Sequence, residues 1–210
     1  MLENPNIQPS WLVLGLFGRP SLNFILGTFG SKKTWLGLDL AVSVATGKPW
    51  LGYQPPAAAP GLFVDAAHGP SEIRRRLRSV IVAQRAPADT PVHFTSLGFC
   101  NFADPQETAA LAAAALSFGA KLIVIDNPLG FGHLDLGRGT SSFLALQPII
   151  SSLRSLAESA NAAVLVLLHT RHRRTALGAA LCALGADHVL AVDSPFGESW
   201  LHLRTLAARD

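Results

Sequence analysis

Five short apolar runs predict buried strands along the chain. None of them alternates cleanly between apolar and polar positions, a pattern typical of parallel strands that are covered on both faces. The runs span residues 22–26, 61–64, 121–125, 163–168 and 188–192.

Four longer stretches between these runs predict helices. The first carries Leu36, Leu40 and Val44 at helical spacing and ends at Gly47. The last contains Pro148, which predicts a bend or a division there. The expected helices span residues 33–46, 71–85, 105–118 and 142–159.

Strands that alternate with helices predict a doubly wound α/β fold, with a mostly parallel sheet, flanking helices and right-handed crossovers. Residues 1–20 are expected to be an N-terminal lead-in segment, and residues 21–210 to form one RecA-like P-loop domain.

Composition narrows the class of protein. Hydrophobic residues make up 49% of the chain and charged residues 15%, which excludes a disordered protein. The net charge of +3 permits a phosphate-rich partner without requiring one. Cys100 and Cys182 have no metal-binding or redox spacing, so a reduced, cytoplasmic setting is expected. No secretory signal and no membrane-length apolar run is apparent, so no membrane partner is expected.

The strongest chemical signal is a candidate phosphate loop. Residues 23–34 read NFILGTFGSKKT, a strand that enters a glycine-containing turn and then a helix beginning with Lys-Thr. Backbone N–H groups of such a turn and the helix N-terminus bind phosphate, so ATP with Mg²⁺ is the expected cofactor. The expected binding residues are Gly27, Thr28, Phe29, Gly30, Ser31, Lys32, Lys33 and Thr34.

Two loop residues have specific expected roles. Lys33 is expected to reach the β and γ phosphates, and the Thr34 hydroxyl to hold Mg²⁺. Lys32 stands where the pattern GxxxxGK[ST] has glycine, so its side chain either narrows the loop or points to solvent. The plainer alternative is an ordinary strand–turn–helix with a lysine in its first turn.

Two later strands end in candidate catalytic residues. The run LIVID ends at Asp126, where a carboxylate can hold the Mg²⁺ shell. The alternative is a turn or N-cap aspartate before Pro128. The run LLHTR places His169 at the end of another strand, at the sheet edge where ligands gather, although a lone histidine is more often structural.

The sequence also resembles a known superfamily. The stretches GTFGSKKTWLGLDLAVSVATGKPWLG, GLFVDAAHGPSEIRRRLRSV and LIVIDNPLGF resemble RepA-like and DnaB/KaiC-like members of the RecA superfamily. The likeness covers nearly the whole chain from about residue 20. Several such proteins replace the penultimate glycine of the loop with a bulkier residue. The resemblance implies nucleotide and Mg²⁺ positions at Gly27, Lys33, Thr34 and Asp126.

The same resemblance implies a partner and an assembly. It makes His169 a γ-phosphate sensor and Arg209 a residue that enters a neighbouring subunit's site. It implies a ring, such as a hexamer, that acts as a helicase on single-stranded DNA in plasmid or phage replication. The pore loops would follow Asp126 and His169. The pore loop after His169 would contain Arg171, Arg173 and Arg174, and the alternative is a plain surface loop. For the arginines within residues 74–78, the alternative to nucleic-acid binding is a solvated helix.

Departures from the family pattern point to slow hydrolysis. After the second strand the family has one or two glutamates, whereas this chain reads Asp65-Ala66-Ala67-His68. Asp65 or His68 is a candidate substitute, and Ala207 replaces the lysine expected two residues before Arg209. A nucleotide-binding scaffold or regulatory subunit is therefore the alternative function, and a KaiC-like signalling ATPase a weaker third.

Overall fold

The computed structural model describes residues 10–97, 100–126, 140–170, 174–194, 198 and 200–209. Their centre is a seven-stranded sheet in the order β5-β4-β6-β7-β3-β8-β9, in which only β9 runs antiparallel to its neighbour. The strands are β3 (Ser21–Gly27), β4 (Gly61–Asp65), β5 (Val92–Ser96), β6 (Leu122–Asp126), β7 (Ala163–His169), β8 (His188–Asp193) and β9 (His202–Ala208).

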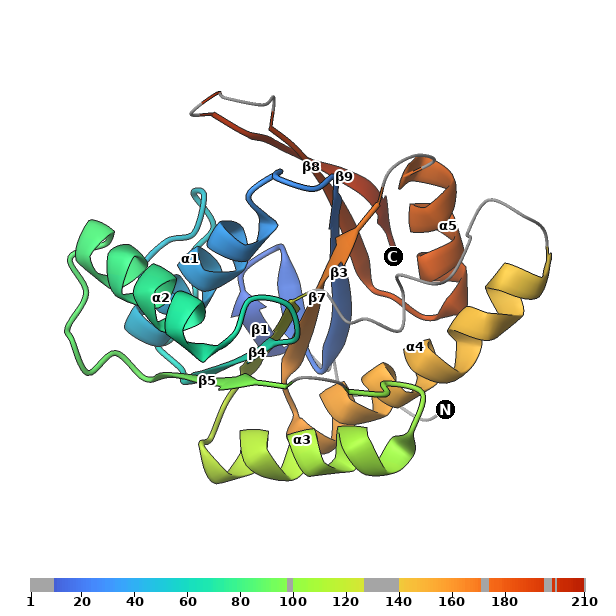
Figure 1. Ribbon diagram of the computed structural model, residues 1–210, viewed down its shortest axis with the longest axis horizontal. Coiled ribbons are helices and arrows are strands. Elements are labelled where there is room, and N and C mark those ends of the chain that lie inside the picture. The colour runs from blue at the N-terminus through green and yellow to red at the C-terminus, as the bar shows by residue number, and fades with distance from the viewer. Residues whose placement is uncertain are drawn as a thin grey trace, which may run out of the picture.

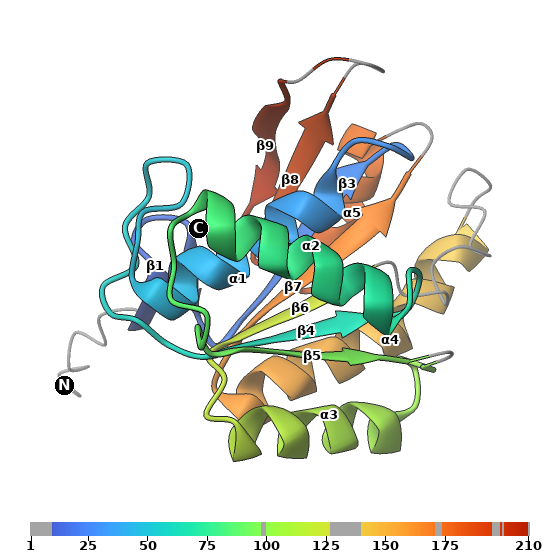
Figure 2. The same ribbon diagram turned by 60° about the vertical axis from the view of Figure 1, so that its left-hand side comes forward.

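Helices cover both faces of this sheet (Figures 1 and 2). One face packs on α1 (Lys33–Thr46) and α2 (Pro70–Ala83), and the other on α3 (Pro105–Ser117), α4 (Thr140–Ala160) and α5 (Arg174–Leu184). The central strands β3, β4 and β6 are buried along their whole length, which explains why their sequences are continuously apolar. The predicted α/β fold with a mostly parallel sheet and flanking helices is confirmed.

Helix α1 packs unusually close to the sheet. A Cβ atom placed on Gly37 would lie 2.9 Å from Leu167 Cδ1 and 3.0 Å from Val124 Cγ1. A side chain there would push the helix away from β6 and β7. Glycine at this position therefore lets α1 lie close to β6 and β7, the strands that end at Asp126 and His169.

The five predicted strands are present, but several elements were not predicted. A hairpin of β1 (Ser10–Val13) and β2 (Phe17–Arg19) lies where a lead-in segment was expected, and it buries Leu12, Val13 and Phe17 against the α1 face. Strands β5 and β9 and helix α5 are the other additions. Helix α4 is a single helix with Pro148 inside it, so the predicted division there does not occur.

Strand register brings the candidate residues to one edge of the sheet. Asp65 pairs with Asp126 between β4 and β6, and Gly27 pairs with His169 between β3 and β7. All four residues end parallel strands, so they lie at the carboxyl edge where open α/β sheets bind ligands. Within the described residues, no helix is long and apolar enough to cross a membrane.

Candidate functional site

The loop between β3 and α1 has a backbone that only particular residues accept. A Cβ atom on Gly27 would lie 2.5 Å from Ser31 Oγ and 2.7 Å from Val192 Cγ1, so this position requires glycine. Gly30 has a φ of +77°, a left-handed conformation that glycine adopts without strain. The Ser31 hydroxyl donates to the Thr28 carbonyl at 2.8 Å and closes the turn.

Lys32 occupies the position where the loop pattern has glycine, and it precedes the first residue of α1. Its φ is 65°, which is left-handed and strained for a residue with a side chain. This conformation is the physical reason for glycine in the pattern. The Lys32 ammonium donates to the carbonyl of Glu198, so its side chain extends toward the β8–β9 connection.

Lys33 lies over the same loop. Its Nζ donates to the carbonyls of Gly27 and Thr28 at 2.9 and 2.8 Å, and to Ser31 Oγ at 3.2 Å. Burial lowers the pKa of Lys33 to about 8, with nearby Asp126 opposing and Arg174 adding to the effect. Among the described residues, the hydrogen-bond acceptors of this ammonium are neutral oxygens, so its charge is available to an anion.

Thr34 and Asp126 join the loop to strand β6. The Thr34 hydroxyl donates to Asp126 Oδ2 at 2.6 Å, and both residues are buried. Burial raises the pKa of Asp126, while the hydrogen bond from Thr34 lowers it. A hydroxyl and a carboxylate in contact offer the oxygen ligands that Mg²⁺ prefers, so these residues fit that ion.

Asp65 organises the turn that follows β4. Oδ1 accepts from the backbone N–H groups of Ala67 and His68 at 3.2 and 3.0 Å, and Oδ2 accepts from Gly69 N–H at 2.8 Å. The Ser96 hydroxyl also donates to Oδ2 at 3.1 Å. Burial alone would raise the pKa of Asp65, but these hydrogen bonds hold it below its usual value.

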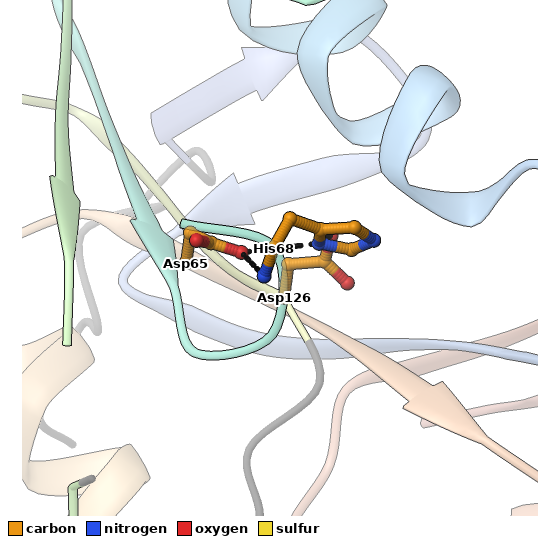
Figure 3. A group of neighbouring side chains, drawn as sticks. All are labelled: Asp65, His68 and Asp126. Atoms are coloured by element: carbon orange, nitrogen blue, oxygen red, sulfur yellow. Dashed lines mark hydrogen bonds and ion pairs between the residues drawn. The ribbon is translucent and has the colours of Figure 1, made fainter. Parts of the chain in front are cut away.

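His68 lies between two buried carboxylates, as Figure 3 shows. Its Nδ1 is 3.1 Å from Asp65 Oδ1 and 3.7 Å from Asp126 Oδ2. Its side chain is 27% exposed, compared with 1% and 3% for the two aspartates. The imidazole thus lies between the carboxylates that end β4 and β6, and it is accessible to solvent.

His169 is close to the phosphate loop, as its place at the end of β7 predicts. Its ring lies edge-on to Phe29, with the ring centroids 6.2 Å apart. The backbone N–H of Thr170 donates to the Gly27 carbonyl at 3.0 Å. The end of β7 is therefore tied to the first residue of the loop, and its role as a sensor stays a prediction.

The candidate arginines lie in different places. Arg174, at the start of α5, pairs with Asp193 at 2.5 Å, and it is close enough to Lys33 to lower its pKa. The N–H of Arg209 donates to the Asp187 carbonyl beside the first residue of β8, at the opposite sheet edge from the loop. Arg171, Arg173 and the loop after Asp126 fall outside the described residues.

A comparison with known families agrees with this geometry. Residues 2–175 match a family model described as an AAA domain. The chain belongs to this AAA domain family. The match covers the phosphate loop, Asp126 and His169, and it indicates a nucleotide-binding, ATPase-type protein. No curated protein matches the chain.

Sequence reasoning did not anticipate two features of this AAA domain. The first is Arg174 beside Lys33, because their proximity depends on α5 and β8 packing next to β3. The second is the number of hydrogen bonds that the Asp65 carboxylate accepts from backbone N–H groups. The Asp-x-x-His-Gly spacing was a signal for this turn, since aspartate commonly accepts from N–H groups two and three residues later.

Proposed function

We propose that this chain binds ATP with Mg²⁺ on residues 27–34 and hydrolyses it slowly, as a ring-forming ATPase of the RepA-like helicase group. The observation that carries the nucleotide-binding proposal is the hydrogen bond between Thr34 and Asp126. This bond joins two side chains that are 92 residues apart in the sequence. The Thr34 hydroxyl is expected to bind Mg²⁺, and the Asp126 carboxylate is expected to hold the ligands around the ion.

The residues divide the work of phosphate binding. Lys33 supplies a positive charge to the phosphates, and the N-terminus of α1 supplies backbone N–H groups with no acidic side chain in its first turn. Thr34 and Asp126 orient the ion. Bound Mg²⁺ would neutralise charge that develops on the transferred phosphoryl group.

Support for a ring comes from the place of Arg209. It lies at the sheet edge opposite the phosphate loop, so it serves a nucleotide site only if a neighbouring chain supplies that site. The resemblance to ring helicases supports the same assembly. Single-stranded DNA as partner rests on the resemblance and on Arg171, Arg173 and Arg174.

The second candidate function is a nucleotide-binding scaffold or regulatory subunit. Ala66 and Ala67 stand where the family has glutamates. The Asp65 carboxylate accepts hydrogen bonds from three backbone N–H groups, which hold its pKa below its usual value and make it a weak base toward water. Both facts favour binding without efficient turnover.

One experiment separates the two candidates. ATP turnover is measured with and without single-stranded DNA, beside nucleotide affinity and light scattering with a non-hydrolysable ATP analogue. The helicase proposal predicts DNA-stimulated turnover and nucleotide-dependent self-association. Tight nucleotide binding without turnover or DNA binding at low salt would favour the scaffold.

The arginine loop has its own test. The change of Arg173 and Arg174 to alanine should weaken DNA binding evenly across sequences and reduce its salt dependence. For single-stranded DNA, each phosphate contacted contributes a slope of roughly −0.7 to log affinity plotted against log salt concentration. The same change at Arg74 and Arg75, on the lateral helix α2, should have less effect. A loop variant that binds DNA like the parent would make the loop plain surface.

A further inference from the structure

Two buried carboxylates share one imidazole at the carboxyl edge of the sheet. Asp65 and Asp126 are 1% and 2% exposed, and in the described part of the chain their ion pairs are both with His68. Lys33 donates instead to the loop carbonyls. Paired buried carboxylates repel one another and are costly to ionise unless a cation compensates them, so a cation between them is favoured.

The spacing of the three side chains fits a metal ion. Ligand atoms that lie about 2.0–2.2 Å from a zinc-like ion are roughly 3–3.5 Å from one another. The His68 Nδ1 atom is 3.1 Å from Asp65 Oδ1 and 3.7 Å from Asp126 Oδ2, and all three ligand atoms lie within 4.8 Å of one another. A small shift of the half-exposed loop residue His68 closes the remaining gap.

The surroundings of the cluster also fit a metal site. Ligating carboxylates are usually held by further hydrogen bonds, which fix their orientation. Asp65 Oδ1 accepts from the N–H groups of Ala67 and His68, and Oδ2 accepts from Gly69 N–H and Ser96 Oγ. Asp126 accepts from Thr34 Oγ1. The exposed side of His68 provides access from solvent and leaves positions for water on the ion.

The imidazole determines which ion the cluster prefers. Mg²⁺ takes oxygen ligands in near-ideal octahedral geometry, whereas nitrogen ligands favour Co²⁺, Ni²⁺ and Zn²⁺. We propose that Asp65, His68 and Asp126 form a binding site for a transition-metal dication of the Co²⁺ and Zn²⁺ class, which is filled without nucleotide. The ion is bound by the neutral imidazole through Nδ1, and it shares Asp126 with the proposed Mg²⁺ position.

A cobalt titration of the full chain without nucleotide tests this site. Calorimetry and the visible absorption of Co²⁺ should show one ion per chain, and millimolar Mg²⁺ should displace it poorly. Loss of a supporting residue typically costs 10–100-fold in metal affinity, so His68→Ala should weaken Co²⁺ binding at least about tenfold. Asp126→Asn should do the same.

His202→Ala is the matched control, because His202 is exposed on β9, at the far end of the strand order from β4. It should bind Co²⁺ like the parent. Equal affinity of His68→Ala and the parent, or no stoichiometric uptake by the parent, would overturn the proposal. If circular dichroism shows that His68→Ala does not fold, His68→Gln and Asp126→Asn decide the question.

Titration of the same samples with Mg²⁺·ATP tests the metal site and the proposed function separately. A parent protein that binds Co²⁺ but no ATP would keep the metal site and contradict the nucleotide proposal. A parent that binds ATP with Mg²⁺ but no Co²⁺ would do the reverse.

Discussion

The Thr34 hydroxyl donates a 2.6 Å hydrogen bond to the buried carboxylate of Asp126. This contact fixes the first turn of α1 against the end of β6. Because Asp126 is 2% exposed, loss of this donor leaves a buried acceptor oxygen without its hydrogen bond.

Thr34→Ala should therefore lower both stability and the effect of Mg²⁺. We expect the free energy of unfolding to fall by about 1–3 kcal/mol, as for a buried acceptor that loses its partner. Mg²⁺ should no longer strengthen nucleotide binding. Urea unfolding and calorimetric titration with and without Mg²⁺ measure the two effects, and Thr34→Ser, which keeps the hydroxyl, should behave like the parent. An Mg²⁺ effect that persists in Thr34→Ala would remove this hydroxyl from the ion's shell.

Lys32 offers a test of the loop backbone. Its φ of 65° costs a residue with a side chain roughly 1–2 kcal/mol, a cost that glycine avoids. Both Lys32→Gly and Lys32→Ala remove the contact with Glu198, so their difference isolates the backbone. The glycine variant should be more stable than the alanine variant by about 1 kcal/mol in urea unfolding. Equal stability would mean that this left-handed conformation is not kept in solution.

The affinity for nucleotide should depend on pH through Lys33. Its pKa is about 8 because of burial, and bound phosphates favour the charged ammonium and raise that pKa. Between the two pKa values the complex holds one more proton than the free protein. Affinity should therefore fall as pH rises above about 8, by up to tenfold per pH unit. Calorimetric titrations from pH 7 to 9.5 measure this slope, and a flat profile would contradict it.

ATP hydrolysis should be slow, and a substitution that adds a carboxylate should accelerate it. Ala67 is exposed within the turn that Asp65 organises, so a carboxylate there would be in contact with water. Ala67→Glu should raise ATP turnover, since a positioned base typically contributes about 10²–10⁴-fold. Ala67→Gln, which has the same shape without the charge, is the control and should stay slow. Rapid turnover by the unaltered chain would show that another group, such as His68, already activates water.

The core strands and the turn between β3 and α1 could be predicted from the sequence because their signals are local. Continuous apolar runs ending at Gly27 and Asp126 mark strands that are buried on both faces, and the Lys33-Thr34 pair marks the start of a helix. Strand register then carries these ends to one edge. The predicted fold and the nucleotide-binding family are confirmed on this basis.

The elements that were missed depend on distant neighbours. Strand β9 has an exposed, mixed pattern and forms because β8 offers it an antiparallel partner. The β1–β2 hairpin is stabilised by burial of Phe17 beside Trp50 in the core on the α1 side. Within the site, the contact between His68 and Asp126 joins the turn after β4 to the end of β6, across 58 positions of sequence (from 68 to 126). No short window of sequence contains such information.

The most direct test of the nucleotide proposal is a calorimetric titration of Mg²⁺·ATP into the parent and into Lys33→Ala. Lys33 donates to loop oxygens at the start of α1, and its removal should leave the fold intact, as circular dichroism would show. Lys121→Ala serves as the control, because Lys121 precedes the first residue of β6, at the sheet edge opposite the loop. The account predicts saturable binding to the parent and to the control, and loss of tight binding in Lys33→Ala. Unchanged affinity in a folded Lys33→Ala protein would contradict it.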